Sequence, residues 1–296
     1  MAEVSTPPEV ASGTATELAA GSSASLNPAT GSPARIFAIA NQKGGVGKTT
    51  TAINLATALA AAGRKVLLID LDPQGNASTG LGVPAAARET GTYELLTGSA
   101  TLDAATTRSA VPGLEITSAN LNLAGAELEL IDLERREFRL ADVLGPEAIE
   151  RWDVVLIDCP PSLNLLTLNA LVAAHAVLVP LQCEFFALEG MSLLARTVER
   201  VRKALNPRLH IAGIVLTMMD RRISLAQQVE ADVRSHFGAL VFATVIPRNV
   251  RVSEAPSHGL PVLLYDNGCA GAQAYVLLAS EFLARAANDS SAGLQQ

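Results

Sequence analysis

Short apolar runs alternate with longer segments of helical periodicity from Arg35 onward. The runs predict strands at Ile36–Ala40, Val66–Asp70, Val154–Asp158, Ala176–Pro180, Ile211–Thr217 and Val241–Ile246. The periodic segments predict helices at Lys48–Ala62, Leu165–Ala174, Leu188–Leu205, Leu225–Phe237 and Ala270–Ala287. This alternation indicates an α/β fold with a doubly wound, mostly parallel sheet flanked by helices. Ligands of such sheets bind at the carboxyl ends of the strands.

The two ends of the chain differ from this pattern. Residues 1–34 are rich in Ala, Ser, Thr, Pro and Gly, so we expect a disordered tail there. A single domain is expected over residues 35–287, followed by a flexible tail over 288–296. Residues 84–145 are the hardest to interpret, and we expect loops and helices packed on one edge of the sheet.

Composition agrees with a buried parallel sheet and a cytoplasmic location. Apolar residues make up 49 % of the chain but aromatics only 4 %, so the core must consist of Ala, Leu, Val and Ile. Three widely spaced cysteines indicate neither disulfides nor a zinc site. Because no stretch of about 18 apolar residues occurs, we predict no membrane span.

Charge is unevenly distributed along the chain. The net charge is −7, yet ten Lys and Arg residues face only four acids between Arg196 and Arg251. A basic region on an acidic protein can still form a surface that binds polyanions.

A glycine-rich loop joins the first predicted strand to the first predicted helix. Its sequence is Asn-Gln-Lys-Gly-Gly-Val-Gly-Lys-Thr-Thr, residues 41–50. Glycines let the backbone N–H groups turn toward phosphates, and the helix N-terminus adds its dipole. The lysine before the helix neutralises phosphate, and the next hydroxyl is placed for Mg²⁺. These features predict ATP and Mg²⁺ as cofactors, with nucleotide contacts from Lys43, Gly44, Gly45, Val46, Gly47, Lys48, Thr49 and Thr50.

The loop departs from the usual phosphate-loop pattern at two positions. Gln42 stands where the first glycine is expected, and Lys43 adds a second cation. This variant resembles the Lys-Gly-Gly-x-Gly-Lys-Thr loop of the ParA/MinD superfamily, and the chain from about Arg35 to Ala286 is similar to its ParA/Soj branch. The resemblance implies that Lys43 reaches nucleotide held by a second subunit, in an ATP-sandwich homodimer. It also implies an ATPase in which Lys43 and Lys48 take part in catalysis.

Acids follow two of the predicted strands at the ligand edge. Asp158 is suited to holding Mg²⁺ directly or through a water, and Asp72 to orienting the attacking water. Asp70 is a candidate for the second shell of the magnesium. Each acid could instead cap a following helix. The resemblance favours the catalytic interpretation of Asp72, and it implies that Pro247 and Asn249 contact the adenine.

The basic region has two interpretations. Its cations could form a solvated surface in which Glu199 pairs with its neighbours. The ParA/Soj resemblance instead implies non-specific binding of double-stranded DNA, nucleoid association, and slow intrinsic ATP turnover that a ParB-type centromere-binding protein stimulates. The candidate DNA-binding residues are Arg200, Arg202, Lys203, Arg221, Arg222 and Arg251.

Two other functions within the superfamily are weighed against DNA partition. A MinD-like membrane-associated positioning ATPase needs a C-terminal amphipathic helix, but the segment from Phe282 to Gln296 has one Arg and no apolar stripe. No membrane partner is therefore expected. Electron transfer or metal-cluster delivery, as in relatives of the nitrogenase iron protein, needs paired cysteines, whereas Cys159 has no Cys-x-x-Cys partner.

Overall fold

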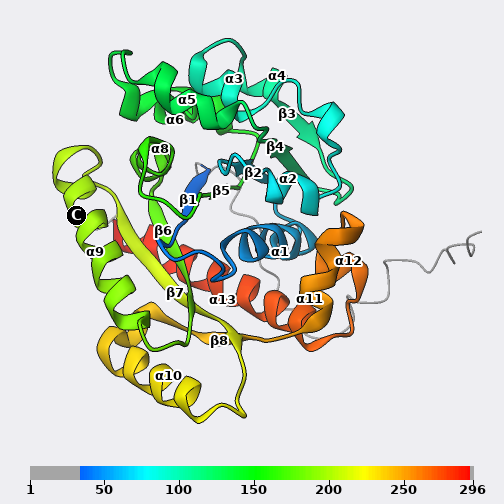
Figure 1. Ribbon diagram of the computed structural model, residues 1–296, viewed down its shortest axis with the longest axis vertical. Helices are drawn as coiled ribbons and strands as arrows, with labels where there is room; N and C mark the ends of the chain where they lie inside the picture. Colours follow the sequence, from blue (N-terminus) through cyan, green and yellow to red (C-terminus); the bar gives the residue numbers. More distant parts are fainter. Residues whose placement is uncertain (1–33, 294–296) are drawn as a thin grey trace, which may run out of the picture. The chain divides into compact units, whose positions relative to one another are not determined.

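The computed structural model describes residues 34–293, and the side chains of residues 34–287. Apart from Ala34, the predicted N-terminal tail lies outside the described residues, as do residues 294–296 of the predicted C-terminal tail. The described chain forms an eight-stranded sheet of order β3-β4-β2-β5-β1-β6-β7-β8 (Figure 1). Its strands are β1 Arg35–Ile39, β2 Val66–Asp70, β3 Thr106–Arg108, β4 Leu114–Thr117, β5 Val154–Asp158, β6 Ala176–Gln182, β7 His210–Met219 and β8 Val241–Pro247.

Every strand pair is parallel except β3 with β4. The central strand β1 lies between β5 and β6, and its last residue, Ile39, is in register with Asp158 of β5. All five residues of β2 and of β5 are buried, as expected for strands covered on both faces. The loop that follows β1 therefore starts in the middle of the sheet, at the carboxyl ends of its strands.

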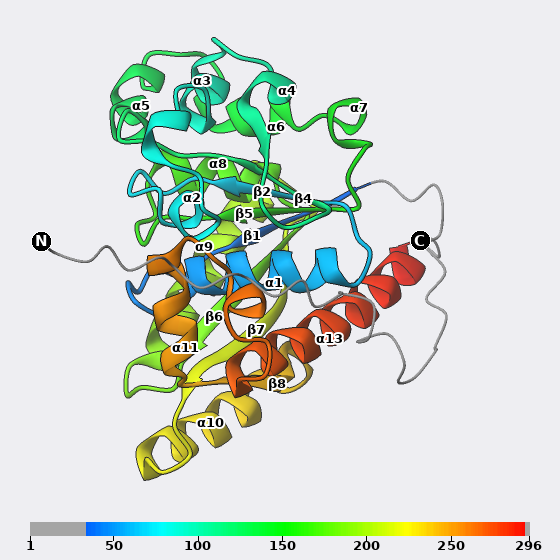
Figure 2. The same ribbon diagram turned by 90° about the vertical axis from the view of Figure 1, so that its right-hand side faces the viewer.

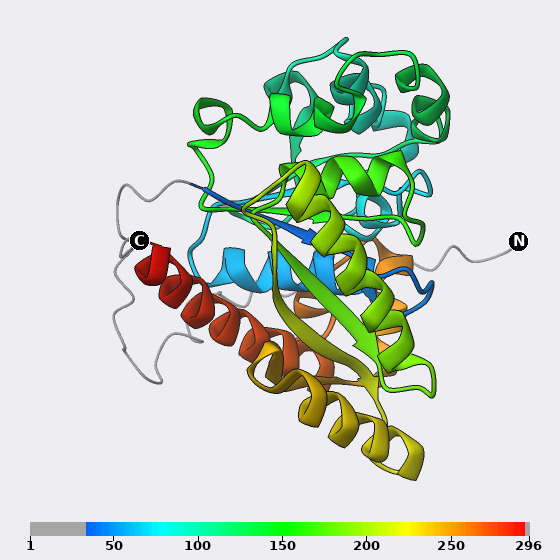
Figure 3. The ribbon, with the colours of Figure 1, turned by 90° about the vertical axis from the view of Figure 1, so that its left-hand side faces the viewer.

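Helices cover both faces of the sheet. They are α1 Lys48–Ala61, α2 Asn76–Gly80, α3 Thr92–Thr97, α4 Leu102–Ala105, α5 Leu123–Leu130, α6 Arg139–Val143, α7 Pro146–Ile149, α8 Leu165–Ala173, α9 Ala187–Ala204, α10 Ser224–Phe237, α11 Val250–Glu254, α12 Val262–Tyr265 and α13 Ala270–Gly293. One apolar cluster joins α1, α11, α12 and α13 to the sheet, and the other joins α3–α6 and α8–α10 to it. Figures 2 and 3 show α1 and α13 together on one side.

The side chains of β1 alternate between the two apolar clusters. Phe37 and Ile39 pack in the cluster with α1 and α13, whereas Ile36 and Ala38 pack in the opposite one. Successive side chains of a strand point to opposite faces, so a continuous apolar run is required where both faces are covered.

The predicted fold class is confirmed, and every predicted strand and helix is present. Their bounds agree within two residues, except that α13 continues to Gly293, six residues beyond the predicted end at Ala287. The expectation for residues 84–145 needs correction, because β3 and β4 extend the sheet there as strands. They have only three and four residues, and Thr107 and Arg108 of β3 are exposed, so neither makes a recognisable apolar run.

Within residues 34–293, none of the helices combines the length and the apolar character that crossing a membrane requires.

Candidate nucleotide-binding site

The loop between β1 and α1 is shaped by its glycines. Gly45 has φ +75° and Gly47 has φ +85°, a left-handed conformation that L side chains rarely adopt. Asn41 fixes the start of the loop, since its Nδ2 donates to the Pro180 carbonyl at 2.8 Å and its Oδ1 accepts from the Lys43 N–H at 3.0 Å. The side chain of Val46 is buried, and its carbonyl accepts a hydrogen bond from Thr217 Oγ1 at 2.8 Å.

The N-terminus of α1 is suited to an anion. Within the described chain, no side chain caps this end, and no acid occupies its first turn. The Lys48 side chain is buried, and its Nζ donates to the Lys43 carbonyl at 3.1 Å. Burial lowers the pKa of Lys48, while the charge of Asp158 acts in the opposite direction. A buried ammonium with one carbonyl partner retains donors for a phosphate.

Asp158 lies beside Lys48 and Thr49 of the loop without a well-formed hydrogen bond. Both of its carboxylate oxygens are buried, and the Thr49 hydroxyl is a donor that approaches them. Burial raises its pKa well above the ordinary value, and the neighbouring charge of Asp70 adds to this effect. Thr49 and Lys48 act in the opposite direction. A buried carboxylate beside a hydroxyl is costly alone but fits a hard divalent cation such as Mg²⁺.

Asp70 and Asp72 have different surroundings although they are close in sequence. Asp70 accepts hydrogen bonds from the N–H of Ser78 at 2.8 Å and from its hydroxyl at 2.7 Å, which fixes the start of α2. Burial raises the pKa of Asp70 to about 6, against these hydrogen bonds. Asp72 accepts from the Gln74 N–H at 3.0 Å and lines the cavity beside the loop. Asp72 is therefore the acid of this pair that borders the cavity.

The cavity at this edge has a volume of about 640 Å³. Its lining unites segments that are far apart in sequence: Gly44, Gly45, Gly47, Lys48, Thr49, Thr50, Asp72, Pro73, Gln74, Asn76, Ala124, Pro160, Pro161, Ser162, Asn164 and Met218. Most of the predicted phosphate loop and Asp72 thus meet in one place, with Asp158 buried nearby. The size suits a small-molecule ligand.

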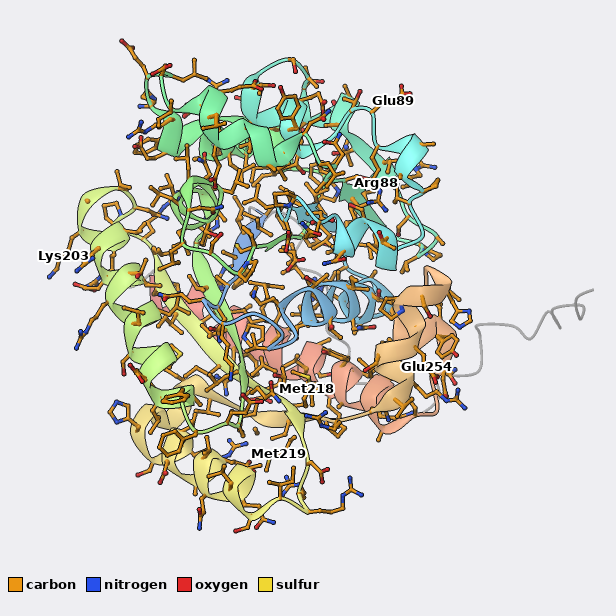
Figure 4. All side chains as sticks on the ribbon, viewed as in Figure 1. Arg88, Glu89, Lys203, Met218, Met219 and Glu254 are labelled. Atoms are coloured by element: carbon orange, nitrogen blue, oxygen red, sulfur yellow. The ribbon has the colours of Figure 1, made fainter. Side chains whose placement is uncertain are left out.

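The sequence indicated neither Met218, which lines the cavity, nor Arg88, which supports a segment beside it. Met218 lines the cavity in a left-handed conformation, with φ +50°, at the end of β7 (Figure 4). Arg88 is buried and donates to the Gly75 carbonyl at 3.2 Å and to Thr79 Oγ1 at 2.9 Å, which ties down α2 and the segment after Asp72. Neither residue belongs to a recognisable motif, and only the folded chain places them here.

Lys43 does not line the cavity. Its half-exposed ammonium forms an ion pair and hydrogen bond with Glu184, which precedes α9 in the same chain. A pair of this exposure contributes little to stability, so Lys43 can change partners at small cost.

Pro247 and Asn249 also lie outside the residues that line the cavity. Asn249 caps α11, since its Oδ1 accepts from the N–H of Arg251 at 2.9 Å and of Val252 at 3.4 Å. The intervening Arg248 N–H donates to the Met219 carbonyl at 3.0 Å. This bond holds the segment from Pro247 to Asn249 beside the end of β7, next to Met218, which lines the cavity.

The candidate DNA-binding residues fall into two groups. Arg200, Arg202 and Lys203 lie in the last turns of α9, which leads to the start of β7, whereas the Arg221–Arg222 pair follows the end of β7. That strand has ten residues, so roughly 33 Å separates its ends. Arg251 belongs with the second group, because the Arg248–Met219 bond places its segment beside the end of β7. Figure 4 shows Lys203 on α9, well away from Met218.

Several of these cations have acidic partners. Arg202 makes two hydrogen bonds to Glu199, at 2.9 and 3.0 Å, and Lys203 pairs with the same carboxylate at 3.3 Å. Arg222 makes two to Asp220, at 2.9 and 2.7 Å, and holds the pKa of that carboxyl at about 2. The side chains of these three cations are exposed, so a DNA phosphate can compete with the carboxylates for them.

The fold and loop together define a nucleotide-binding protein of the phosphate-loop class. A family model described as an AAA domain matches residues 34–211. The chain is 62 % identical over 256 residues to the chromosome partitioning protein ParA of Caulobacter vibrioides, covering 86 % of this chain and 95 % of that protein. It is 50 % identical over 251 residues to the sporulation initiation inhibitor protein Soj of Bacillus subtilis, covering 84 % and 98 %. The chain belongs to the ParA/Soj family of chromosome-partitioning ATPases.

Solved structures with this fold are similar over most of their length. One is a Mycobacterium smegmatis protein named cobyrinic acid a,c-diamide synthase, with bound ATP analog and magnesium (TM-score 0.73, 39 % identity, covering 83 % of this chain and 93 % of that one). Another is the cell division ATPase MinD of Pyrococcus furiosus (TM-score 0.70, 27 % identity, covering 83 % and 97 %).

Proposed function

We propose that this chain is a Mg²⁺-dependent ATPase with slow intrinsic turnover, whose nucleotide site lies at the loop after β1. The N–H groups of the loop and the Lys48 ammonium bind the phosphates, and Thr49 and Asp158 hold Mg²⁺. Bound Mg²⁺ supplies neutralisation of phosphate charge. Asp72, at the wall of the cavity, orients the attacking water. The main support for this proposal is the buried Asp158 carboxylate near the uncapped N-terminus of α1 and the buried Lys48.

We infer that ATP joins two copies of the chain in a homodimer. Lys43 leaves Glu184 and reaches the nucleotide of the partner subunit, and its exposed position outside the chain's own cavity supports this. Pro247 and Asn249 complete the site at the adenine, since their segment is tied to the end of β7. Residues 35–287 act as one ATPase domain.

The ATP-bound dimer binds double-stranded DNA without sequence preference. Arg221, Arg222 and Arg251 are the foremost contacts, because they stand at the same strand ends as the nucleotide site, where a change in nucleotide state acts most directly. Arg200, Arg202 and Lys203 extend the contact from the far end of β7. Phosphate contacts of this kind need cations rather than base readout.

Hydrolysis releases the DNA, and a ParB-type protein stimulates it, so the chain cycles on and off the nucleoid in the cytoplasm. ATP must favour the DNA-competent state differentially for such a switch to operate. A MinD-like membrane function has no supporting observation in the described chain, and we propose no membrane partner.

Binding to a non-specific duplex, measured by fluorescence anisotropy with ATP, ADP or no nucleotide, tests this function. ATP-dependent binding that weakens steeply with salt is expected. Equal binding in all three nucleotide states, or no DNA binding by an ATP-bound dimer, would contradict it.

A further inference from the structure

Arg88 is a buried arginine in a segment that is otherwise exposed. Within residues 84–90 every other side chain is exposed to water, whereas Arg88 is only 8 % exposed. In Figure 4, Arg88 lies closer to α2 than the neighbouring Glu89 does. Charged side chains are almost never buried unless they are paired. The burial of Arg88 therefore requires an explanation from its contacts.

The guanidinium group of Arg88 donates to three uncharged acceptors. Its Nε donates to the Val83 carbonyl at 3.0 Å, and Nη2 donates to the same oxygen and to Thr79 Oγ1 at 2.9 Å. Its Nη1 donates to the Gly75 carbonyl at 3.2 Å. No carboxylate of the described chain accepts a hydrogen bond from it, although the charge of Asp70 opposes the lowering of the Arg88 pKa by burial. The planar group thus holds backbone and hydroxyl oxygens in place rather than forming an ion pair.

One of these acceptors belongs to the turn that carries Asp72. The Gly75 N–H donates to the Asp72 carbonyl at 2.8 Å, and the Gln74 N–H donates to Asp72 Oδ1 at 3.0 Å. Gly75 has φ +62°, and a Cβ built on it would lie 2.6 Å from Arg88 Nη1 and 2.9 Å from the Ala119 carbonyl oxygen. The turn over residues 72–75 is therefore packed directly on the guanidinium group.

The backbone of Arg88 is anchored independently of this turn. Asn120 Nδ2 donates to the Arg88 carbonyl at 2.8 Å, just after the end of β4. The start of α2 is fixed separately, by the hydrogen bonds from Ser78 to Asp70. Arg88 therefore joins the Asp72 turn to the end of β4, and α2 does not depend on it alone.

We propose that Arg88 is a positioning residue for ATP hydrolysis, whose bond to the Gly75 carbonyl holds the turn over residues 72–75 so that Asp72 faces the attacking water. This inference rests on the proposed function, because it takes Asp72 as the residue that orients that water. Arg88 does not line the nucleotide cavity and acts through Asp72. Its loss should therefore lower the turnover number, kcat, and leave the affinity for ATP unchanged.

The test compares Arg88→Ala with the wild type as full chains. Phosphate release at saturating Mg-ATP gives kcat, and titration with a fluorescent ATP analogue gives the affinity. We expect kcat to fall roughly 10- to 100-fold, since a small misplacement of a catalytic group has effects of this size. Free guanidinium ion, added far below denaturing concentrations, should restore part of the lost turnover, which a merely structural role would not allow.

Arg139→Ala is the matched control. Arg139 is also partly buried and donates to a backbone carbonyl, that of Leu96, at 2.9 Å. Its Nη2 lies 2.7 Å from the position of a Cβ built on Gly98, much as Arg88 lies against Gly75. Arg139 does not line the nucleotide cavity. Arg139→Ala should keep the wild-type kcat and should not respond to guanidinium ion.

Arg88→Lys keeps the charge in case the alanine variant does not fold. A single ammonium cannot reproduce the planar fork, so this variant should fold and still lose turnover. Wild-type kcat in Arg88→Lys or in Arg88→Ala would overturn the proposal. So would a joint loss of kcat and ATP affinity that guanidinium ion does not restore.

A double variant separates this inference from the proposed function. If Arg88 acts through Asp72, adding Arg88→Ala to Asp72→Ala should lower phosphate release no further. Additive losses would overturn the positioning role while leaving Asp72 as the residue that orients water. Undiminished hydrolysis in Asp72→Ala alone would instead refute that part of the proposed function.

Discussion

Replacing Asp158 by Asn should stabilise the protein in the absence of nucleotide and abolish its response to Mg-ATP. The wild-type carboxyl is buried without a well-formed hydrogen bond. At a pH of about 7.5, the cost of its burial is limited to about 5 kcal/mol, because a carboxyl with an ordinary pKa of 3.8 takes up a proton beyond that point. Asn keeps a buried polar group that costs about 1–3 kcal/mol and removes the charge that faces Lys48, so the gain is at most about 3 kcal/mol.

That gain corresponds to a rise in Tm of roughly 6–12 °C for a domain of this size. Mg-ATP at about 100 times its Kd stabilises the wild type by about 2.7 kcal/mol, and at about 1,000 times by about 4.1 kcal/mol. The Asp158→Asn variant cannot gain this stabilisation by Mg-ATP if Asp158 holds the metal. The two Tm values should therefore converge at about 100 times the Kd and reverse their order toward about 1,000 times the Kd.

The pH dependence has a definite sign. The folded-state pKa of Asp158 is raised, so the cost of burial is present above the ordinary pKa and disappears as protonation becomes complete at low pH. The advantage of Asp158→Asn should shrink as the pH falls from about 7.5 toward 4. Differential scanning calorimetry with EDTA or with Mg-ATP measures both effects, with the exposed Asp132→Asn as control. A variant less stable than wild type in EDTA would refute the reasoning.

Three further substitutions test the switch. Lys43→Gln should bind ATP with wild-type affinity but dimerise at least about tenfold more weakly by analytical ultracentrifugation, and unchanged dimerisation would remove its role across the interface. Asp72→Ala should lower phosphate release about 10²-fold or more and leave the DNA complex persistent, and undiminished hydrolysis would exclude it as the residue that orients water. Arg222→Glu should dimerise normally yet lose about tenfold or more in DNA affinity, with Arg208→Glu as an exposed control; retained affinity would place the DNA contact elsewhere.

The phosphate loop was predictable because its chemistry is local. The positive φ angles of Gly45 and Gly47 follow from residues that are adjacent in sequence. The end of β7 was not predictable in the same way, since Met218 adopts a left-handed conformation that bulky residues rarely take. Only the fold brings it to the cavity.

Long-range placement also limited what the sequence could show about the cations. The basic region between Arg196 and Arg251 suggests one surface, but β7 separates the last turns of α9 from the turn at Arg222.

The most direct test of the switch follows DNA release and ATP hydrolysis in the same sample. The full chain is loaded onto labelled non-specific duplex with Mg-ATP, free ATP is removed, and anisotropy and phosphate release are recorded together. DNA release at the rate of phosphate release, with both slowed in Asp72→Ala, is the predicted result. DNA release that precedes phosphate release, or that keeps its wild-type rate in Asp72→Ala, would contradict a switch driven by hydrolysis.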